Sequence, residues 1–177
     1  MTKFQSTSEK ILSAQEASLS EDIVLQSLEE CRLATQKAFE IAKINIHLFC
    51  QNFEPRIYDN NSLINLTSEL LRLQRNSRVK ILVQDGKQLV KNGHRFVELS
   101  QRLSSKFEIR KIHHDFSTLT QSFLIVDSKC LIYRPHFERF EGTINFAAPR
   151  SCDDKEKLFQ SIWEKSEPDS ELRRLHL

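Results

Sequence analysis

The sequence has little of the residues that break or cross-link a chain, with three glycines, four prolines and four cysteines among 177 residues. This scarcity excludes a collagen-like or low-complexity chain, and 39% hydrophobic with 28% charged residues is typical of a compact globular protein. It also lacks a run of about 20 apolar residues that could span a bilayer, and the apolar core of an N-terminal secretory signal. These absences predict one domain without a membrane span, located in the cytoplasm.

The chain also lacks closely spaced cysteines and the motifs of common cofactor sites. The cysteines stand far apart, with apolar neighbours and no CxxC pair, at Cys31, Cys50, Cys130 and Cys152. This spacing favours small core residues over disulfides or zinc ligands. No Walker loop, dinucleotide fingerprint, zinc finger or RNA-recognition signature is present. We expect neither a cofactor nor a bound metal.

A large net charge is missing too, since the formal charge is +2, but the charges are unevenly distributed. Residues 72–111 contain eleven Lys and Arg against three acids, and the segments on both sides are acidic. Two interpretations are open: the bases are solvated positions on helices, or they form a surface that attracts phosphate groups. The second predicts weak nucleic-acid binding without sequence preference, through the anion-binding residues Arg75, Arg78, Lys87, Lys91 and Arg95.

The hydrophobic pattern changes repeatedly between helical and strand periods. Helices are predicted once or twice within 8–42, over 63–73, over 87–103 with a break at Asn92-Gly93, and from 151 to just before Pro168. Strands are predicted over 44–49, 79–83, 107–112, 123–126, 130–133 and 143–146.

The order of these elements defines a fold class. Strands separated by helices imply a parallel sheet centre, and the close pair 123–126 and 130–133 implies an antiparallel hairpin. The sequence therefore predicts an α/β fold, in which helices flank a mixed sheet with a parallel centre. Its predicted parts are a helical extension at 1–42, an α/β domain at 43–166 and a C-terminal tail at 167–177.

One stretch of the chain carries a family resemblance. Asp127 follows the buried strand 123–126, and Phe159 stands four residues before Trp163 in the last helix. With the order of elements from residue 40 to residue 165, this resembles one half of a phospholipase D-like domain. That family's signature is His-x-Lys, four residues and then Asp, in which His attacks phosphorus and Lys holds the phosphate oxygens.

Placing Asp127 at the motif's Asp puts Thr120 at the His position and Ser122 at the Lys position. A Thr hydroxyl without a base is a poor nucleophile, and a Ser hydroxyl supplies no positive charge to a phosphate. The resemblance therefore implies a degenerate half-domain with no catalytic residue. Single-motif members of this class place two half-sites face to face, which implies a homodimer.

The chain is also similar to an uncharacterised bacterial family of unknown function. The stretches that carry this similarity are Glu54–Asp59, Gly93–Arg95 and Glu171–Arg174. Some members are attached behind acetyltransferase-type domains, but no acetyltransferase signature is present here. This similarity strengthens the fold prediction without supplying an activity.

The degenerate cleft is expected at the carboxyl ends of the strands, where open α/β sheets place ligands. Besides the three motif positions, it includes His113, His114, Arg134 and His136. A His pair before Asp115 could bind a metal or perform acid–base work, but adjacent strand residues point to opposite faces unless a turn begins there. The sequence favours a solvated loop at this point. For the loop around His136, a recognition surface and a hairpin end are equal alternatives.

Three functions fit these patterns. The favoured one is a non-catalytic binding or regulatory module that holds nucleic acid or another phosphate-bearing ligand. The first alternative is a hydrolase or phosphodiesterase that uses His113, His114 or His136. The second is a protein-interaction subunit that acts through the N-terminal helices.

Overall fold

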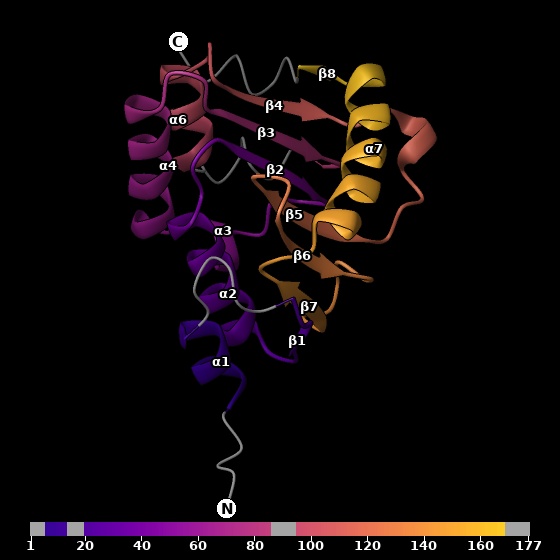
Figure 1. The fold of residues 1–177 in the computed structure, drawn as a ribbon. Coiled ribbons are helices and arrows are strands. Elements are labelled where there is room, and N and C mark those ends of the chain that lie inside the picture. Colours follow the sequence, from indigo (N-terminus) through magenta and orange to yellow (C-terminus); the bar gives the residue numbers. More distant parts are fainter. Residues whose placement is uncertain (1–5, 14–19, 86–94, 169–177) are drawn as a thin grey trace, which may run out of the picture.

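The computed structural model describes residues 6–13, 20–85 and 95–168, and its centre is an eight-stranded mixed sheet (Figure 1). The strands, in the order in which they lie in the sheet, are β1 (Ile23–Leu25), β7 (Gly142–Asn145), β6 (Cys130–Arg134), β5 (Ser122–Val126), β2 (Asn45–Cys50), β3 (Arg78–Val83), β4 (Phe107–Lys111) and β8 (Glu167–Pro168). Strands β2, β3 and β4 are parallel, and all other pairings are antiparallel. The predicted α/β class with a parallel centre is confirmed.

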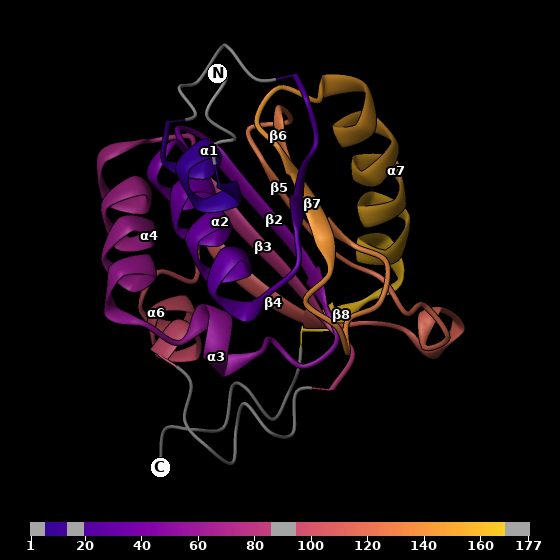
Figure 2. The same cartoon turned by 90° about the horizontal axis from the view of Figure 1, so that it is seen from below.

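Helices cover both faces of this sheet (Figure 2). One face carries α1 (Thr7–Ser13), α2 (Leu28–Glu40), α3 (Pro55–Tyr58), α4 (Asn61–Leu73) and α6 (Arg95–Arg102). The other face carries α7 (Pro149–Lys165). The result is a three-layer sandwich with one apolar core on each side of the sheet.

The central strands are apolar on both faces because both faces are covered. In β3, Val79, Ile81 and Val83 belong to the larger core, which also contains residues of α2, α4 and α6. Leu82, between them, belongs to the smaller core, which also contains residues of α7. Alternate side chains of a strand point to opposite faces, which explains why the second half of β3, residues 81–83, is apolar at every position.

The structure differs from the sequence predictions at both ends of the chain. Within the predicted helical extension, residues 23–25 form β1, which pairs with β7 and makes β7 an inner strand. The last helix begins at Pro149. Proline is tolerated in the first turn because the N–H groups there have no acceptor within the helix. In the predicted tail, β8 pairs with β4. The boundaries at residues 42 and 167 stay predictions, although the same sheet crosses both of them.

All four cysteines are unpaired and buried, as predicted for small core residues. Burial raises the pKa of Cys31 to about 11 and the pKa values of Cys50 and Cys152 to about 12, and it also raises the pKa of Cys130. The protonated thiols therefore act as apolar packing groups. None of the helices in the described part of the chain has the length and apolarity needed to cross a bilayer.

Candidate functional sites at the two ends of the sheet

The parallel strands define two ends of the sheet. We call the end where β2, β3 and β4 finish the carboxyl end, and the end where they begin the amino end. Strand β5 begins and β6 finishes at the carboxyl end, because Phe123 pairs with Phe49 and Ser122 pairs with Arg134. Six of the seven predicted cleft residues accordingly lie at the carboxyl end: His113, His114, Thr120, Ser122, Arg134 and His136.

The residues at the two motif positions are occupied by local hydrogen bonds. Ser122 is buried, and its hydroxyl donates to the carbonyl of Phe49 at 3.1 Å. The Thr120 hydroxyl donates to the carbonyl of Pro135 at 3.3 Å, while its own carbonyl accepts from the N–H of Phe137 at 2.8 Å. Within the described residues, neither hydroxyl bonds to an imidazole or a carboxylate that could activate it.

Arg134 is buried and stabilises the loop that follows β6. Its Nε donates to the carbonyl of Arg139 at 2.8 Å, and its Nη2 donates to the carbonyl of Phe137. The guanidinium also lies over the ring of Phe140, 5.3 Å from the centroid, and Phe140 packs against the larger core. These contacts support the interpretation of this loop as a hairpin end, with His136 exposed on it.

Asp127, the seventh predicted cleft residue, is not brought together with the others. It lies in the β5–β6 turn at the amino end, about 16 Å from Ser122 at 3.3 Å per strand residue. Its carboxylate accepts three backbone N–H bonds, from Lys43 at 2.7 Å, Ile44 at 2.8 Å and Asn45 at 2.7 Å. Asp127 therefore holds the start of β2 and contacts no group of the carboxyl end.

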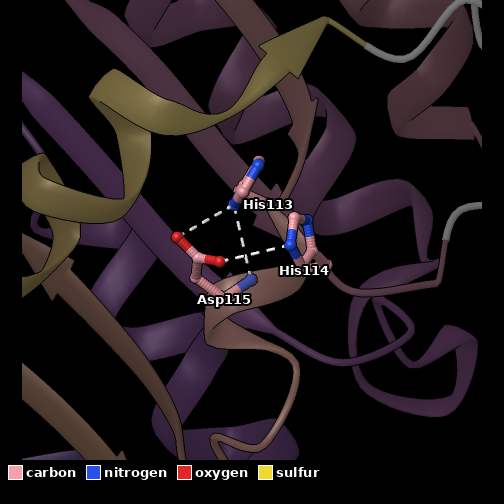
Figure 3. A group of neighbouring side chains, drawn as sticks. All are labelled: His113, His114 and Asp115. Atoms are coloured by element: carbon pink, nitrogen blue, oxygen red, sulfur yellow. Dashed lines mark hydrogen bonds and ion pairs between the residues drawn. The ribbon is translucent and has the colours of Figure 1, made fainter.

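The His pair lies where β4 leaves the sheet and turns into a 3-10 helix, η1 (His114–Phe116) (Figure 3). Asp115, which sequence analysis did not include in the cleft, lies beside the two rings and contacts both of them. His113 Nδ1 is 3.3 Å from Asp115 Oδ2, and His114 Nε2 is 3.3 Å from Asp115 Oδ1. The side-chain amide of Gln84 fastens this loop by donating to the carbonyls of Ser117 at 3.2 Å and Leu119 at 3.0 Å.

Basic residues gather at the amino end. Backbone hydrogen bonds join neighbouring chain segments there: Val79 N–H to the Lys106 carbonyl, Arg78 N–H to the Ile44 carbonyl and Asp127 N–H to the Asn45 carbonyl. They bring five basic residues to this end, which we call the basic row: Lys106, Arg75, Arg78, Lys43 and Lys129. The ammonium group of Lys106 donates to the carbonyls of Leu71 at 2.6 Å and Gln74 at 2.9 Å. Lys43 and Lys129 were missed because they lie outside the basic segment of the sequence and are brought to it only by strand pairing.

The predicted anion-binding residues do not all join this row. Arg75 and Arg78 belong to it, but Arg95 donates to Asn61 Oδ1 at 2.7 Å, at the first residue of α4. Arg75 lies beyond the other end of this 13-residue helix, about 20 Å away at 1.5 Å per residue. The structure therefore separates Arg95 from the other two. Lys87 and Lys91 lie outside the described residues.

Several solved structures share this fold. Nuc, a phospholipase D family member from Salmonella typhimurium, aligns with a TM-score of 0.56 and 15% identity over 84% of this chain and 99% of its own. NucT from Helicobacter pylori aligns with a TM-score of 0.59 and 8% identity over the same shares. TrmBL2, an archaeal chromatin protein described as showing a novel mode of DNA binding, aligns with a TM-score of 0.62 and 20% identity over 89% of this chain. This chain spans 57% of TrmBL2.

At these identities the similarities establish the fold and not an activity. No curated protein matches the sequence of this chain. The model of one family, described as "Domain of unknown function (DUF7931)", matches residues 27–175, which include every described element from α2 onward. The chain therefore belongs to the DUF7931 family, and its domain has a phospholipase D-like fold.

Proposed function

We propose that this protein is a non-catalytic binding module that holds nucleic acid by its phosphate backbone. The observation that carries the proposal is the basic row at the amino end of the sheet. Four unpaired cysteines fit a reducing compartment, and we place its action in the cytoplasm. The homodimer implied by the family resemblance stays a prediction.

The spacing of the basic row suits a polyanion. Neighbouring strands lie about 4.8 Å apart, so bases at successive strand starts present a line of positive charge rather than a single point. The carboxylate within this line, Asp127, is engaged by three backbone N–H groups. On the side of α7, Glu156 contacts His47 Nδ1 at 2.8 Å. The local field therefore favours an anion over a cation.

The DNA binding of TrmBL2, an aligned chromatin protein, is compatible with this role. The exposed amides of Gln74 and Asn76 flank Arg75, but the five bases of the row outnumber them, so contacts to phosphate would dominate. We expect similar affinities for duplexes of different sequence and of equal length.

Fluorescence anisotropy with a labelled 30-base-pair duplex tests the proposal. Three to five phosphate contacts would weaken binding ~40-fold to ~500-fold between 50 and 200 mM salt. The triple substitution Lys43→Ala, Arg78→Ala, Lys129→Ala should lower the magnitude of the log–log salt slope by about 2.7, at about 0.9 per contact. All three side chains are exposed, so folding should be preserved.

The matched control is the triple substitution Lys111→Ala, Arg139→Ala, Lys165→Ala, which removes three exposed bases at the carboxyl end of the sheet. Its salt slope should equal that of the wild type. A slope that the triple substitution leaves unchanged, or no binding at 50 mM salt, would refute the proposal and favour a protein partner instead.

The non-catalytic part of the proposal has its own test. The hydroxyls of Thr120 and Ser122 are engaged with backbone carbonyls, so the full-length protein should not hydrolyse bis(p-nitrophenyl) phosphate above the buffer rate. Turnover that disappears in His113→Ala or His114→Ala would support the hydrolase alternative. A His136→Ala variant separates the two candidate regions in the same assay.

A further inference from the structure

We propose that His113, His114 and Asp115 bind a divalent transition-metal ion of the zinc class. This site lies at the carboxyl end of the sheet and goes beyond the proposed nucleic-acid binding at the amino end. Among the residues that the structure describes, these three form the one group of His, Cys, Asp or Glu whose ligand atoms all lie within 4.8 Å of one another.

The turn at the end of β4 creates this convergence. His113 has an extended backbone (φ −67°, ψ 148°), and η1 begins at the next residue. The alternation of a strand is broken there, so the two rings lie on the same side, with centroids 4.0 Å apart and planes tilted by 44°. This is the condition that sequence analysis required for a shared site.

The distances between donor atoms suit a tetrahedral metal. Ligands bound to zinc at 2.0–2.1 Å in a tetrahedral arrangement are separated by ~3.3 Å. Each histidine nitrogen lies 3.3 Å from a different oxygen of Asp115, and His113 Nδ1 also accepts a 3.4 Å hydrogen bond from the Asp115 N–H, so small side-chain rotations would bring the three ligands onto one ion. Two imidazoles with one carboxylate are a donor set that zinc, cobalt, nickel and iron accept, whereas magnesium and calcium prefer oxygen ligands alone.

The site is supported on one side and open on the other. Gln84, which follows β3, donates to three carbonyl groups of the loop, those of Phe116, Ser117 and Leu119. The side chain of His114 is 83% exposed, which leaves room for water or a further ligand on the metal. An open coordination position distinguishes this site from a closed, four-ligand structural zinc site.

The ammonium group of Lys165 in α7 competes with a metal ion for the Asp115 carboxylate. Its Nζ lies 3.5 Å from Asp115 Oδ2 and 5.4 Å from the centre of the Phe116 ring. The metal and this ammonium group would share one carboxylate, so Lys165 must move aside when the metal binds. Its side chain is 58% exposed and can do so.

Titration of the full-length protein with Zn²⁺, followed by calorimetry and repeated with Co²⁺ by absorption spectroscopy, tests the proposal. We expect one saturable site. Removing a ligand should weaken binding at least as much as the ~10-fold to ~100-fold loss seen when only a supporting outer residue is removed. His113→Ala and His114→Ala should both show this loss, and the matched control His136→Ala should bind as the wild type does.

The Lys165→Gln variant should bind Zn²⁺ more tightly than the wild type, whereas the histidine variants bind it more weakly. It removes the competing ammonium group and should tighten Zn²⁺ binding several-fold, which adventitious binding to an exposed histidine would not show. Absence of saturable binding would overturn the proposal, and so would an affinity unchanged in the His113→Ala, His114→Ala double variant. The anisotropy assay reports on the amino end of the sheet, so either proposal can fail without the other.

Discussion

Asp127→Ala is expected to destabilise the protein by about 3–5 kcal/mol, because three backbone N–H groups lose one charged acceptor. A hydrogen bond to a charged group contributes about 1.5–3 kcal/mol, and contributions that share one carboxylate are not additive. Asp127 also has a positive φ of 53°, a conformation that costs Ala about 1–2 kcal/mol. Urea unfolding followed by circular dichroism measures the effect.

Asp127→Asn is the matched control for this prediction. Its amide oxygen can still accept hydrogen bonds, and Asn adopts positive φ more readily than Ala. We expect a loss of about 1–2 kcal/mol, clearly smaller than that of Asp127→Ala. If both variants lose less than about 1 kcal/mol, Asp127 does not hold the start of β2 as described.

Phe96→Ala should cost about 3–5 kcal/mol, because it removes a fully buried ring from the larger core. Phe96 makes edge contacts with Phe39, Phe53 and Phe107, at centroid distances of 6.2, 5.3 and 5.8 Å. It thereby joins α6 to α2, to β4 and to the segment after β2. The same unfolding measurement applies.

Two control substitutions give stability losses against which that of Phe96→Ala is compared. Phe96→Leu keeps most of the apolar volume and should lose clearly less than Phe96→Ala. Leu73→Ala removes an apolar side chain that is 70% exposed, so its effect should stay within about 0.5 kcal/mol. A Phe96→Ala variant as stable as Leu73→Ala would contradict the packing described for α6.

The long periodic elements were predictable from the sequence, and the short ones were not. The apolar repeat of α4 and the β-branched run of β3 gave their types correctly. Strands β1 and β8 have three and two residues, too few for any period, and only their partner strands define them. The family register placed Thr120, Ser122 and Asp127 in one cleft, but β5 separates them, because its length puts Asp127 at the opposite end of the sheet.

The candidate sites were predicted less completely because they depend on segments far apart in the chain. Lys43 and Lys129 reach the basic row through pairing of β2 with its neighbours, which local charge density does not reveal. The convergence of His113 and His114 depends on a single 3-10 turn. Arg134 looked like a ligand-binding residue, but its donors bond to carbonyls of its own loop.

The shortness of β1 and β8 also affects how copies of this protein meet. Each lies at the outer edge of the sheet, where free N–H and C=O groups could otherwise recruit a strand from another copy. Strand β8 ends in Pro168, which has no N–H to offer, and β1 offers only three residues to a partner. The β1 edge is therefore poorly suited to strand addition, whereas at the opposite edge β8 covers only Arg110 and Lys111 of β4 within the described residues, so that edge is where another chain could add a strand.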